Sequence, residues 1–344
     1  MKILITGGAG MVGSHAAEHF AKKKWTVVVL DNLSRSKLFK ANRQSVEYNW
    51  RYLGRFRTVE RVRGDVRDGR DVRRALGKGV DALLHAAAQP GVGFSIQNPT
   101  EDFAINTQGT LNVLESLRKI SPKAAFLFCS TNKVYGENVD KIPLVEEKRR
   151  YRFRGTRGVG ETFPIDLAGH TPYGVSKYAA DLYTQEYGSL YGMKTGIFRM
   201  SCIYGPRQFG FEDQGWVAHF VIRSVLRKPL TIYGDGKQVR DVLYVSDLVE
   251  AYEQFIEKAK GPDVFNIGGG ARQTTSLLEF VSLLEKKLGA RVRIRFKAWR
   301  TSDQKVYISD TSKIEKKLHW RASVPFEEGL QKLIEWVEEN RGLL

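Results

Sequence analysis

Tyr173 and Lys177 are the pair of side chains whose types and spacing most clearly suggest chemistry. They stand four residues apart in T-P-Y-G-V-S-K, and this spacing puts both on one face of a helix. A phenol has a pKa of about 10 and is a poor base at neutral pH. A neighbouring ammonium stabilises the phenolate and lowers that pKa. We therefore predict that Tyr173 takes a proton from a hydroxyl while a hydride leaves the same carbon.

Thr131 is the predicted third member of this catalytic set. It follows the apolar run A-A-F-L-F-C, where a buried strand is expected at 124–129, and it precedes Asn132 and Lys133. The amide of Asn132 cannot exchange a proton at neutral pH, and Lys133 has the opposite charge to a carboxylate. Acid–base chemistry by a pair of carboxylates is therefore excluded at these two positions. In the plainer alternative, Asn132 caps the turn at the strand end and Lys133 is solvated.

A glycine-rich turn near the N-terminus predicts dinucleotide binding. Gly7, Gly10 and Gly13 stand between the expected strand K-I-L-I-T and a helix expected over 12–24. Such glycines let backbone amides approach a pyrophosphate at the start of the helix. Asp31 ends the next strand, W-T-V-V-V-L, where a carboxylate bonds adenosine ribose hydroxyls and repels a 2′-phosphate. NAD is therefore favoured over NADP.

The elements that position these residues alternate between strands and helices. Further strands are expected at 59–63, 81–85 and 195–200, with helices near 69–77, 100–119 and 173–191. Continuous apolar strands between amphipathic helices predict an α/β fold, a Rossmann-like doubly wound parallel sheet with a smaller C-terminal α/β substrate domain. We expect an NAD-binding domain at 1–200 plus 242–258. A nucleotide-sugar-binding domain is expected at 201–241 plus 259–344.

Composition limits the classes of partner. The net charge of +17 attracts anions, which include nucleic acid, anionic membranes and phosphorylated small molecules. No apolar run approaches the roughly 20 residues of a membrane helix. The six histidines have no ligand spacing, so no metal site is expected. Cys129 and Cys202 lie in apolar surroundings, which fits buried thiols in a reducing compartment, and a cytoplasmic location is expected.

The whole chain resembles the extended short-chain dehydrogenase/reductase family, the sugar-nucleotide epimerases and dehydratases. The matching segments are T-G-G-A-G-M-V-G, D-N-L-S, G-D-V-R-D, H-A-A-A-Q, V-Y-G, Y-G-V-S-K, Y-G-P-R, R-D-V-L-Y-V-S-D and R-T-S-D. The resemblance implies NAD as cofactor and a nucleotide-diphosphate sugar as substrate. It also implies a homo-oligomer, a dimer or tetramer, and neither nucleic acid nor a membrane is expected as a partner.

The resemblance also assigns roles to single residues. The implied cofactor-binding residues are Gly7, Gly10, Met11, Val12, Gly13, Asp31, Asn32, Ser34, Arg35, Asp65, Val66, Ala86, Ala88, Gln89, Tyr173 and Lys177. The implied substrate-binding residues are Asn132, Arg207, Gln214, Arg240 and Arg300. Asp65 and Val66 would flank the adenine. Arg240 and Arg300 would pair with the diphosphate, because planar guanidinium groups bind phosphate through two hydrogen bonds.

The residues after Thr131 narrow the reaction. In the dehydratase branch of the family they are typically Asp and Glu, so T-N-K argues against dehydration. T-N-K-V-Y-G, D-Q-G-W-V and G-K-Q-V-R-D-V-L resemble one branch, the CDP-paratose (CDP-tyvelose) 2-epimerases, which favours epimerisation at C2 of a CDP-sugar. A UDP-glucose or UDP-uronate 4-epimerase is an alternative. A non-catalytic NAD- or RNA-binding scaffold is another. The basic segment 148–157 is either a lid over the substrate or a solvated loop.

Overall fold

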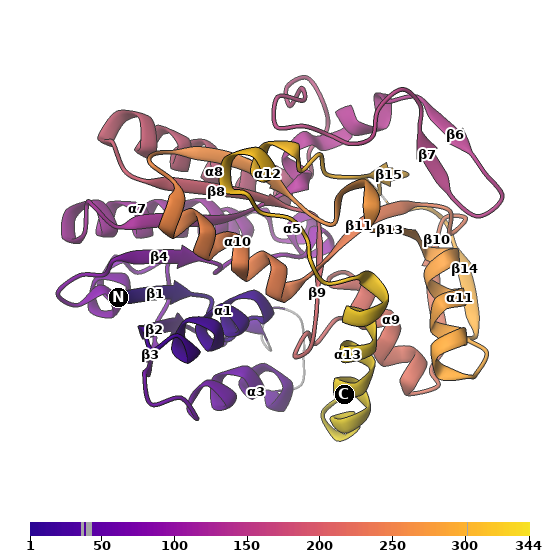
Figure 1. Ribbon diagram of the computed structural model, residues 1–344, viewed down its shortest axis with the longest axis horizontal. Helices are drawn as coiled ribbons and strands as arrows, with labels where there is room; N and C mark the ends of the chain where they lie inside the picture. The colour runs from indigo at the N-terminus through magenta and orange to yellow at the C-terminus, as the bar shows by residue number, and fades with distance from the viewer. Residues whose placement is uncertain (36–37, 39–42, 301) are drawn as a thin grey trace. The chain divides into compact units, whose positions relative to one another are not determined.

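A seven-stranded sheet has the strand order β12-β8-β5-β4-β1-β2-β3 in the computed structural model (Figure 1), which describes residues 1–35, 38, 43–300 and 302–344. The strands are β1 (Lys2–Thr6), β2 (Thr26–Asp31), β3 (Val59–Arg63), β4 (Ala82–His85), β5 (Ala125–Thr131), β8 (Thr195–Met200) and β12 (Asp263–Ile267). Neighbouring strands from β3 to β5 are parallel. The strand order reverses between β1 and β4, which is where open α/β sheets bind ligands. The predicted Rossmann-like fold is confirmed.

Helices connect these strands. They are α1 (Met11–Lys22), α3 (Arg43–Leu53), α4 (Gly69–Leu76), α5 (Val92–Gln97), α6 (Pro99–Phe103), a π-helical segment (Ala104–Gln108), α7 (Gly109–Ile120) and α8 (Pro172–Tyr191). The sequence sets the ends of α8: the Thr171 hydroxyl accepts a hydrogen bond from Gly174 N, Pro172 is the first residue, and Gly192 has a φ of 65°. These signals place Tyr173 and Lys177 in the first turns of α8.

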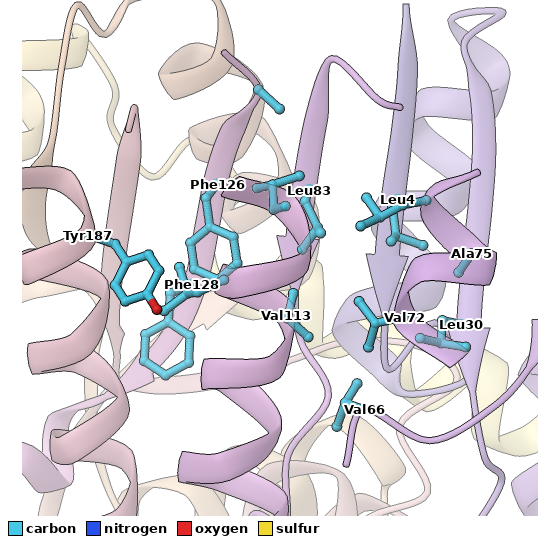
Figure 2. Packing of buried hydrophobic residues seen from close by; sticks show 14 of the residues in the cluster. Leu4, Leu30, Val66, Val72, Ala75, Leu83, Val113, Phe126, Phe128 and Tyr187 are labelled. Carbon is cyan, nitrogen blue, oxygen red and sulfur yellow. The ribbon is translucent and has the colours of Figure 1, made fainter. Parts of the chain in front are cut away.

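The apolar core beside the sheet holds these elements in place. Leu4, Leu83 and Phe126 project from β1, β4 and β5 toward Val72 of α4 and Val113 of α7 (Figure 2). All five side chains are fully buried. A buried leucine or phenylalanine side chain stabilises the fold by about 1.5–3 kcal/mol. The strands β1, β4 and β5 are therefore fixed by packing against helices.

The chain divides into two compact units. Unit 1 comprises Met1–Val134, Thr171–Arg199 and Val249–Phe265, and unit 2 comprises Tyr135–His170, Met200–Leu248 and Asn266–Leu344. These bounds differ from the expected domains in two places. Segment 135–170 belongs to unit 2, and the segment that returns to unit 1 is 249–265 rather than 242–258. The reason for the second difference is that β12, expected in the small domain, is the edge strand of the large sheet.

Unit 2 is built around β11 (Val239–Tyr244). This strand pairs with β13 (Thr274–Ser276) in antiparallel fashion and with β9 (Cys202–Tyr204) and β15 (Val306–Tyr307) in parallel fashion. The other elements are β6 (Leu144–Glu146), β7 (Tyr151–Phe153), α9 (Trp216–Val225), β10 (Leu230–Tyr233), α11 (Leu277–Leu288), β14 (Ile294–Lys297), α12 (Ser312–Leu318) and α13 (Phe326–Glu339), with α10 (Val245–Lys258) running on into unit 1. Within the described parts of the chain, no helix is long and apolar enough to cross a membrane.

Candidate active site

The glycine turn between β1 and α1 has the geometry of a dinucleotide cradle. Gly7 has a φ of 70°, and a Cβ added there would lie 2.6 Å from Ala87 N. A Cβ at Gly13 would lie 2.3 Å from Gly7 O. Both positions therefore require glycine. Gly10, Met11 and Val12 begin α1, and no side chain caps this helix. The N–H groups of its first turn suit a phosphate ligand.

Asp31 is tied to this turn by its carboxylate. Its Oδ2 accepts a hydrogen bond from Ala9 N at 2.9 Å, and its Oδ1 accepts one from Leu33 N at 2.8 Å. Burial raises the pKa of Asp31, while these two hydrogen bonds oppose the rise. The carboxylate therefore stands at the carboxyl end of β2, next to the glycine turn. This is the position at which it would meet the adenosine ribose.

The other predicted cofactor residues follow the ends of neighbouring strands. Asn32 Nδ2 donates to Asp65 Oδ2 at 2.8 Å, which joins the segment after β2 to the segment after β3. Asn32 Oδ1 accepts from Ser34 N at 2.9 Å, and burial lowers the pKa of Arg35 to about 10. Val66 is buried in the core beside the sheet. Ala86, Ala88 and Gln89 directly follow β4.

The three predicted catalytic residues come together in unit 1. Thr131 is the last residue of β5, and α8 packs against that strand. The Thr131 side chain lies close enough to the Tyr173 hydroxyl to act on the pKa of that phenol. The Lys177 ammonium lies 4.1 Å from the centre of the Phe128 ring, a cation–π contact in a side chain that is only 2% exposed.

Burial decides the protonation of this set. It raises the pKa of Tyr173 to about 12, against the opposing effect of the nearby Thr131 side chain. It lowers the pKa of Lys177 to about 8, although the negative charges of Asp181 and Asp102 oppose that change. The chain without its cofactor therefore does not lower the tyrosine pKa. The expected lowering also depends on the positive charge of a bound nicotinamide, and for that state it stays a prediction. The desolvation of the phenolate outweighs the stabilisation that was expected from the ammonium.

Asn132 and Lys133 shape the turn beneath Thr131. The Thr131 hydroxyl donates to Asn132 Oδ1 at 3.4 Å and accepts from Lys133 N at 3.2 Å. Asn132 therefore contacts the predicted catalytic hydroxyl, as a residue at the substrate should. The same contacts also fit the plainer alternative of a turn cap.

In unit 2, Arg240 and Arg300 lie near one another. Arg240, on β11 and mostly buried, donates to Asp303 Oδ1 at 2.6 Å. Asp303 N in turn donates to Arg300 O at 3.3 Å. The Arg300 guanidinium stacks 3.8 Å from the centre of the Tyr233 ring and donates to Glu212 O at 2.9 Å. Both arginines therefore have partners in the chain; Thr301 of the motif R-T-S-D lies outside the described residues.

Arg207 and Gln214 lie on the segment between β9 and α9. Arg207 is buried and has a φ of 60°, a left-handed conformation that is uncommon outside glycine. The backbone N–H of Gln214 donates to Phe211 O at 3.0 Å, and Phe211 N returns the hydrogen bond to Gln214 O. The segment is therefore a structured turn of unit 2.

The basic segment 148–157 forms part of a hairpin of β6 and β7. Arg149 donates to Leu278 O and to Ser282 Oγ, and Arg150 donates to Thr274 Oγ1 at 2.7 Å. These contacts attach the hairpin to α11 and β13. Arg149 and Arg150 thus have a structural role within unit 2. They do not need a diphosphate ligand to explain their positive charge, so they do not support a lid.

A buried polar network beneath α8 was missed at the level of sequence. It includes Ser95, Asp102, Asn106 and Ser176, and each of these side chains is at most 2% exposed. The sequence does contain a signal for this network: the polar residues at 102, 106 and 110 are four positions apart and would share one face of a helix. It was overlooked because only apolar periodicity was followed along 100–119.

Comparison with known proteins agrees with this geometry. The profile of the NAD dependent epimerase/dehydratase family matches residues 3–268. A CDP-paratose 2-epimerase of Salmonella typhi is 38% identical over 98% of this chain and 99% of that protein. A UDP-glucose 4-epimerase of Thermotoga maritima, solved with UDP-glucose, has a TM-score of 0.83 at 31% identity and covers 99% of this chain and 100% of its own. A UDP-glucuronic acid 4-epimerase of Bacillus cereus, solved with UDP-glucuronic acid and NAD, has a TM-score of 0.83 at 28% identity over 98% of this chain and 99% of its own.

These similarities test the predictions at the level of the family. An enzyme, an epimerase that uses NAD as cofactor, was predicted and is confirmed. The roles of single residues and the domain functions stay predictions. With a family profile that matches most of its length and a relative that matches nearly all of it, the chain belongs to the NAD dependent epimerase/dehydratase family.

Proposed function

We propose that this enzyme inverts C2 of a CDP-linked hexose, by transient oxidation of the carbinol to a ketone and reduction from the other face. CDP-paratose, which would become CDP-tyvelose, and a relative such as CDP-glucose are the candidate substrates. The full-length similarity to a CDP-paratose 2-epimerase supports the substrate class. The observation that carries the reaction type is the contact of Asn132, rather than a carboxylate, with Thr131.

The glycine turn, the uncapped start of α1 and Asp31 fit NAD and would hold it. When bound there, NAD⁺ accepts a hydride from the sugar and later returns it. Tyr173 would remove the proton of the C2 hydroxyl as a base and give it back as an acid. Thr131 would hydrogen-bond the same oxygen. Because burial raises the pKa of Tyr173 to about 12 in the chain alone, positive charge at the reacting site is needed to form the phenolate.

In unit 2, Arg240 and Arg300 would bind the diphosphate through two hydrogen bonds each. Arg207 and Gln214 would contribute to the same nucleotide-sugar site. A homo-oligomer is part of the proposal, because α8 exposes a stripe of large apolar side chains of a kind that marks protein interfaces. These are Val175, Leu182, Tyr183, Leu190 and Tyr191.

A 4-epimerase of UDP-glucose or of a UDP-uronate is the second candidate. It is favoured by the similarity to the two 4-epimerase structures and uses the same three catalytic residues. A scaffold that binds NAD or RNA without catalysis is the third. The closeness of Thr131 to the Tyr173 hydroxyl argues against it, because a protein without catalysis has no need of that arrangement. Salt-sensitive retention of RNA would support the scaffold instead.

Incubation with CDP-paratose and with CDP-, UDP-, dTDP- and GDP-glucose in D₂O, followed by NMR, separates these candidates. We expect inversion at C2 of a CDP-sugar, with no deuterium at C2 because a hydride held on the cofactor does not exchange with water. Tyr173→Phe should lower the rate about 10²–10⁴-fold. Inversion at C4 of a UDP-sugar would favour the second candidate. Deuterium at C2 would refute the hydride route, and a 4-keto-6-deoxy product would refute the argument from Asn132 and Lys133.

A further inference from the structure

The first turn of α8 is held by side chains of other elements and by one of its own. Tyr173 N donates to Ser95 Oγ of α5 at 3.0 Å, and Ser176 Oγ donates to Tyr173 O at 3.1 Å. Asn106 Nδ2 of the π-helical segment lies 3.1 Å from Ser176 Oγ and donates to it. Side chains therefore hold both backbone groups of Tyr173, and α5 and the π-helical segment help to set the position of its phenol.

Asp102 is the only carboxylate of this network among the residues described. It lies on α6 and is fully buried. One of its oxygens, Oδ1, accepts hydrogen bonds from Gln89 Nε2 at 2.7 Å and from Asn106 Nδ2 at 3.1 Å. Burial raises the pKa of Asp102, and the hydrogen bond from Gln89 is among the effects that oppose the rise. Asp102 thus links the segment after β4, where the cofactor is expected, to the turn that carries Tyr173.

We propose that Asp102 is a positioning residue of the reaction, which fixes the Tyr173 backbone through Asn106 and Ser176. The proposal rests on the proposed function in one respect, namely that Tyr173 is the base. Asp102 does not touch the predicted reacting atoms. Its effect is transmitted through the network and through its charge.

The charge of Asp102 favours the protonated form of both neighbours. It raises the pKa of Tyr173 and that of Lys177. The other groups that act on Lys177 are Asp181 of its own helix and the Cys129 thiol of β5. His85 of β4 faces the same space, and burial lowers its pKa to about 3, so it is neutral there. Among the residues described, Asp102 and Asp181 are therefore the two carboxylates that oppose the loss of the proton from the buried Lys177.

Asp102→Asn removes the negative charge and keeps nearly the same side-chain shape. Asparagine retains an oxygen that accepts from Gln89 and Asn106, and its new N–H₂ group can donate to Ser176 Oγ. Without the negative charge, both pKa values should fall. The phenolate of Tyr173 should form at lower pH, and the ammonium of Lys177 should also be lost at lower pH. The pH window of activity should therefore move toward acid as a whole.

The test is a spectroscopic titration of Tyr173 in the NAD-loaded protein. The absorbance at the phenolate band is followed against pH for the wild type and for Asp102→Asn, and each Tyr173→Phe counterpart is subtracted. We expect the Tyr173 midpoint to fall by about one pH unit in Asp102→Asn. The matched control is Thr184→Val, which removes a buried α8 hydroxyl that bonds only its own helix at Ala180 O, and its midpoint should not change. An unchanged midpoint in Asp102→Asn would overturn the charge effect.

The positioning effect has its own comparison. Asp102→Ala removes the acceptor for Gln89 and Asn106, so kcat should fall about tenfold or more below that of Asp102→Asn, at equal NAD content. Equal kcat in the two variants would overturn the positioning effect. If Asp102→Ala does not fold, the titration of Asp102→Asn still decides. A wild type that epimerises no CDP-sugar would refute the proposed function and leave the titration intact, so the two failures are distinguishable.

Discussion

A buried ion pair behind the catalytic helix gives the sharpest prediction of stability. Asp181 of α8 is fully buried and accepts hydrogen bonds from Ser130 Oγ at 2.7 Å and Gln185 Nε2 at 2.7 Å. It also accepts from Arg199 Nε at 3.0 Å and from a second Arg199 nitrogen at 3.1 Å. Arg199 of β8 is itself only 3% exposed. The pair therefore joins α8, β5 and β8 at one point.

We expect Asp181→Leu to lower the free energy of unfolding by about 3–5 kcal/mol. Removing one partner of a buried pair leaves the other charge uncompensated, and this cost, rather than the loss of attraction, dominates. The fully buried carboxylate and its four hydrogen bonds put the expected cost in the upper half of that range. The double variant Asp181→Leu with Arg199→Met should recover most of the loss, because apolar replacement of both charges is often neutral.

Urea unfolding followed by tryptophan fluorescence measures these changes, since the chain has six tryptophans. Lys22→Ala is the control: it breaks an exposed pair with Glu18 one helical turn away and should cost less than about 0.5 kcal/mol. A cost below about 1 kcal/mol for Asp181→Leu would refute the reasoning. A double variant as unstable as the single would show that lost packing, not uncompensated charge, is the cause.

Three further predictions follow from single contacts. NAD should co-purify with the wild type. It should be lost in Gly13→Ala, whose Cβ would lie 2.3 Å from Gly7 O, whereas Gly10→Ala should retain more NAD because its Cβ would lie 3.1 Å from the nearest atom. Equal amounts of NAD released on denaturing the two variants would contradict this prediction. Burial would raise the pKa of Glu253, but hydrogen bonds with Lys23 and His19 hold it below the usual value. The stabilisation by the Glu253 carboxylate is therefore complete above about pH 4.5 and lost as the pH falls through the lowered pKa. Glu253→Gln should accordingly destabilise at pH 6.5 and much less at pH 3, by urea unfolding. Arg149→Ala should speed tryptic cleavage within 144–153 with or without CDP, because Arg149 attaches the hairpin to α11; cleavage that slows only with CDP would restore the lid interpretation.

The sheet and the cofactor turn were predictable because local patterns determine them. Continuous apolar runs marked β2, β4 and β5 to within a few residues, since buried parallel strands have no polar face. The spacing of Gly7, Gly10 and Gly13 follows from close backbone approach, which only glycine allows. Tyr173 and Lys177 needed only the helix period. Each of these signals lies within one short stretch of the chain.

Features that depend on contacts between distant segments could not be predicted from local sequence patterns. The hairpin of β6 and β7 belongs to unit 2 because Arg149 and Arg150 meet residues more than 120 positions away. β12 pairs with β8 at the edge of the large sheet, although a strand of its length fits either unit. The rise of the Tyr173 pKa in the chain without its cofactor could not be predicted either, because it depends on burial by the whole fold. A helical spacing gives the neighbours of a phenol but not its exposure to water.

The partners of Arg240 and Arg300 show what binding of the proposed diphosphate would require. Arg240 is only 9% exposed, and its buried guanidinium is already paired with the Asp303 carboxylate. Arg300 is close to Glu212 and Asp213, at 3.6 and 3.5 Å. Binding of the diphosphate would therefore exchange one set of anionic partners for another, and the gain is the difference between two charged pairings rather than the value of one. A neutral sugar offers no such exchange, and a ligand that cannot replace these carboxylates would be rejected.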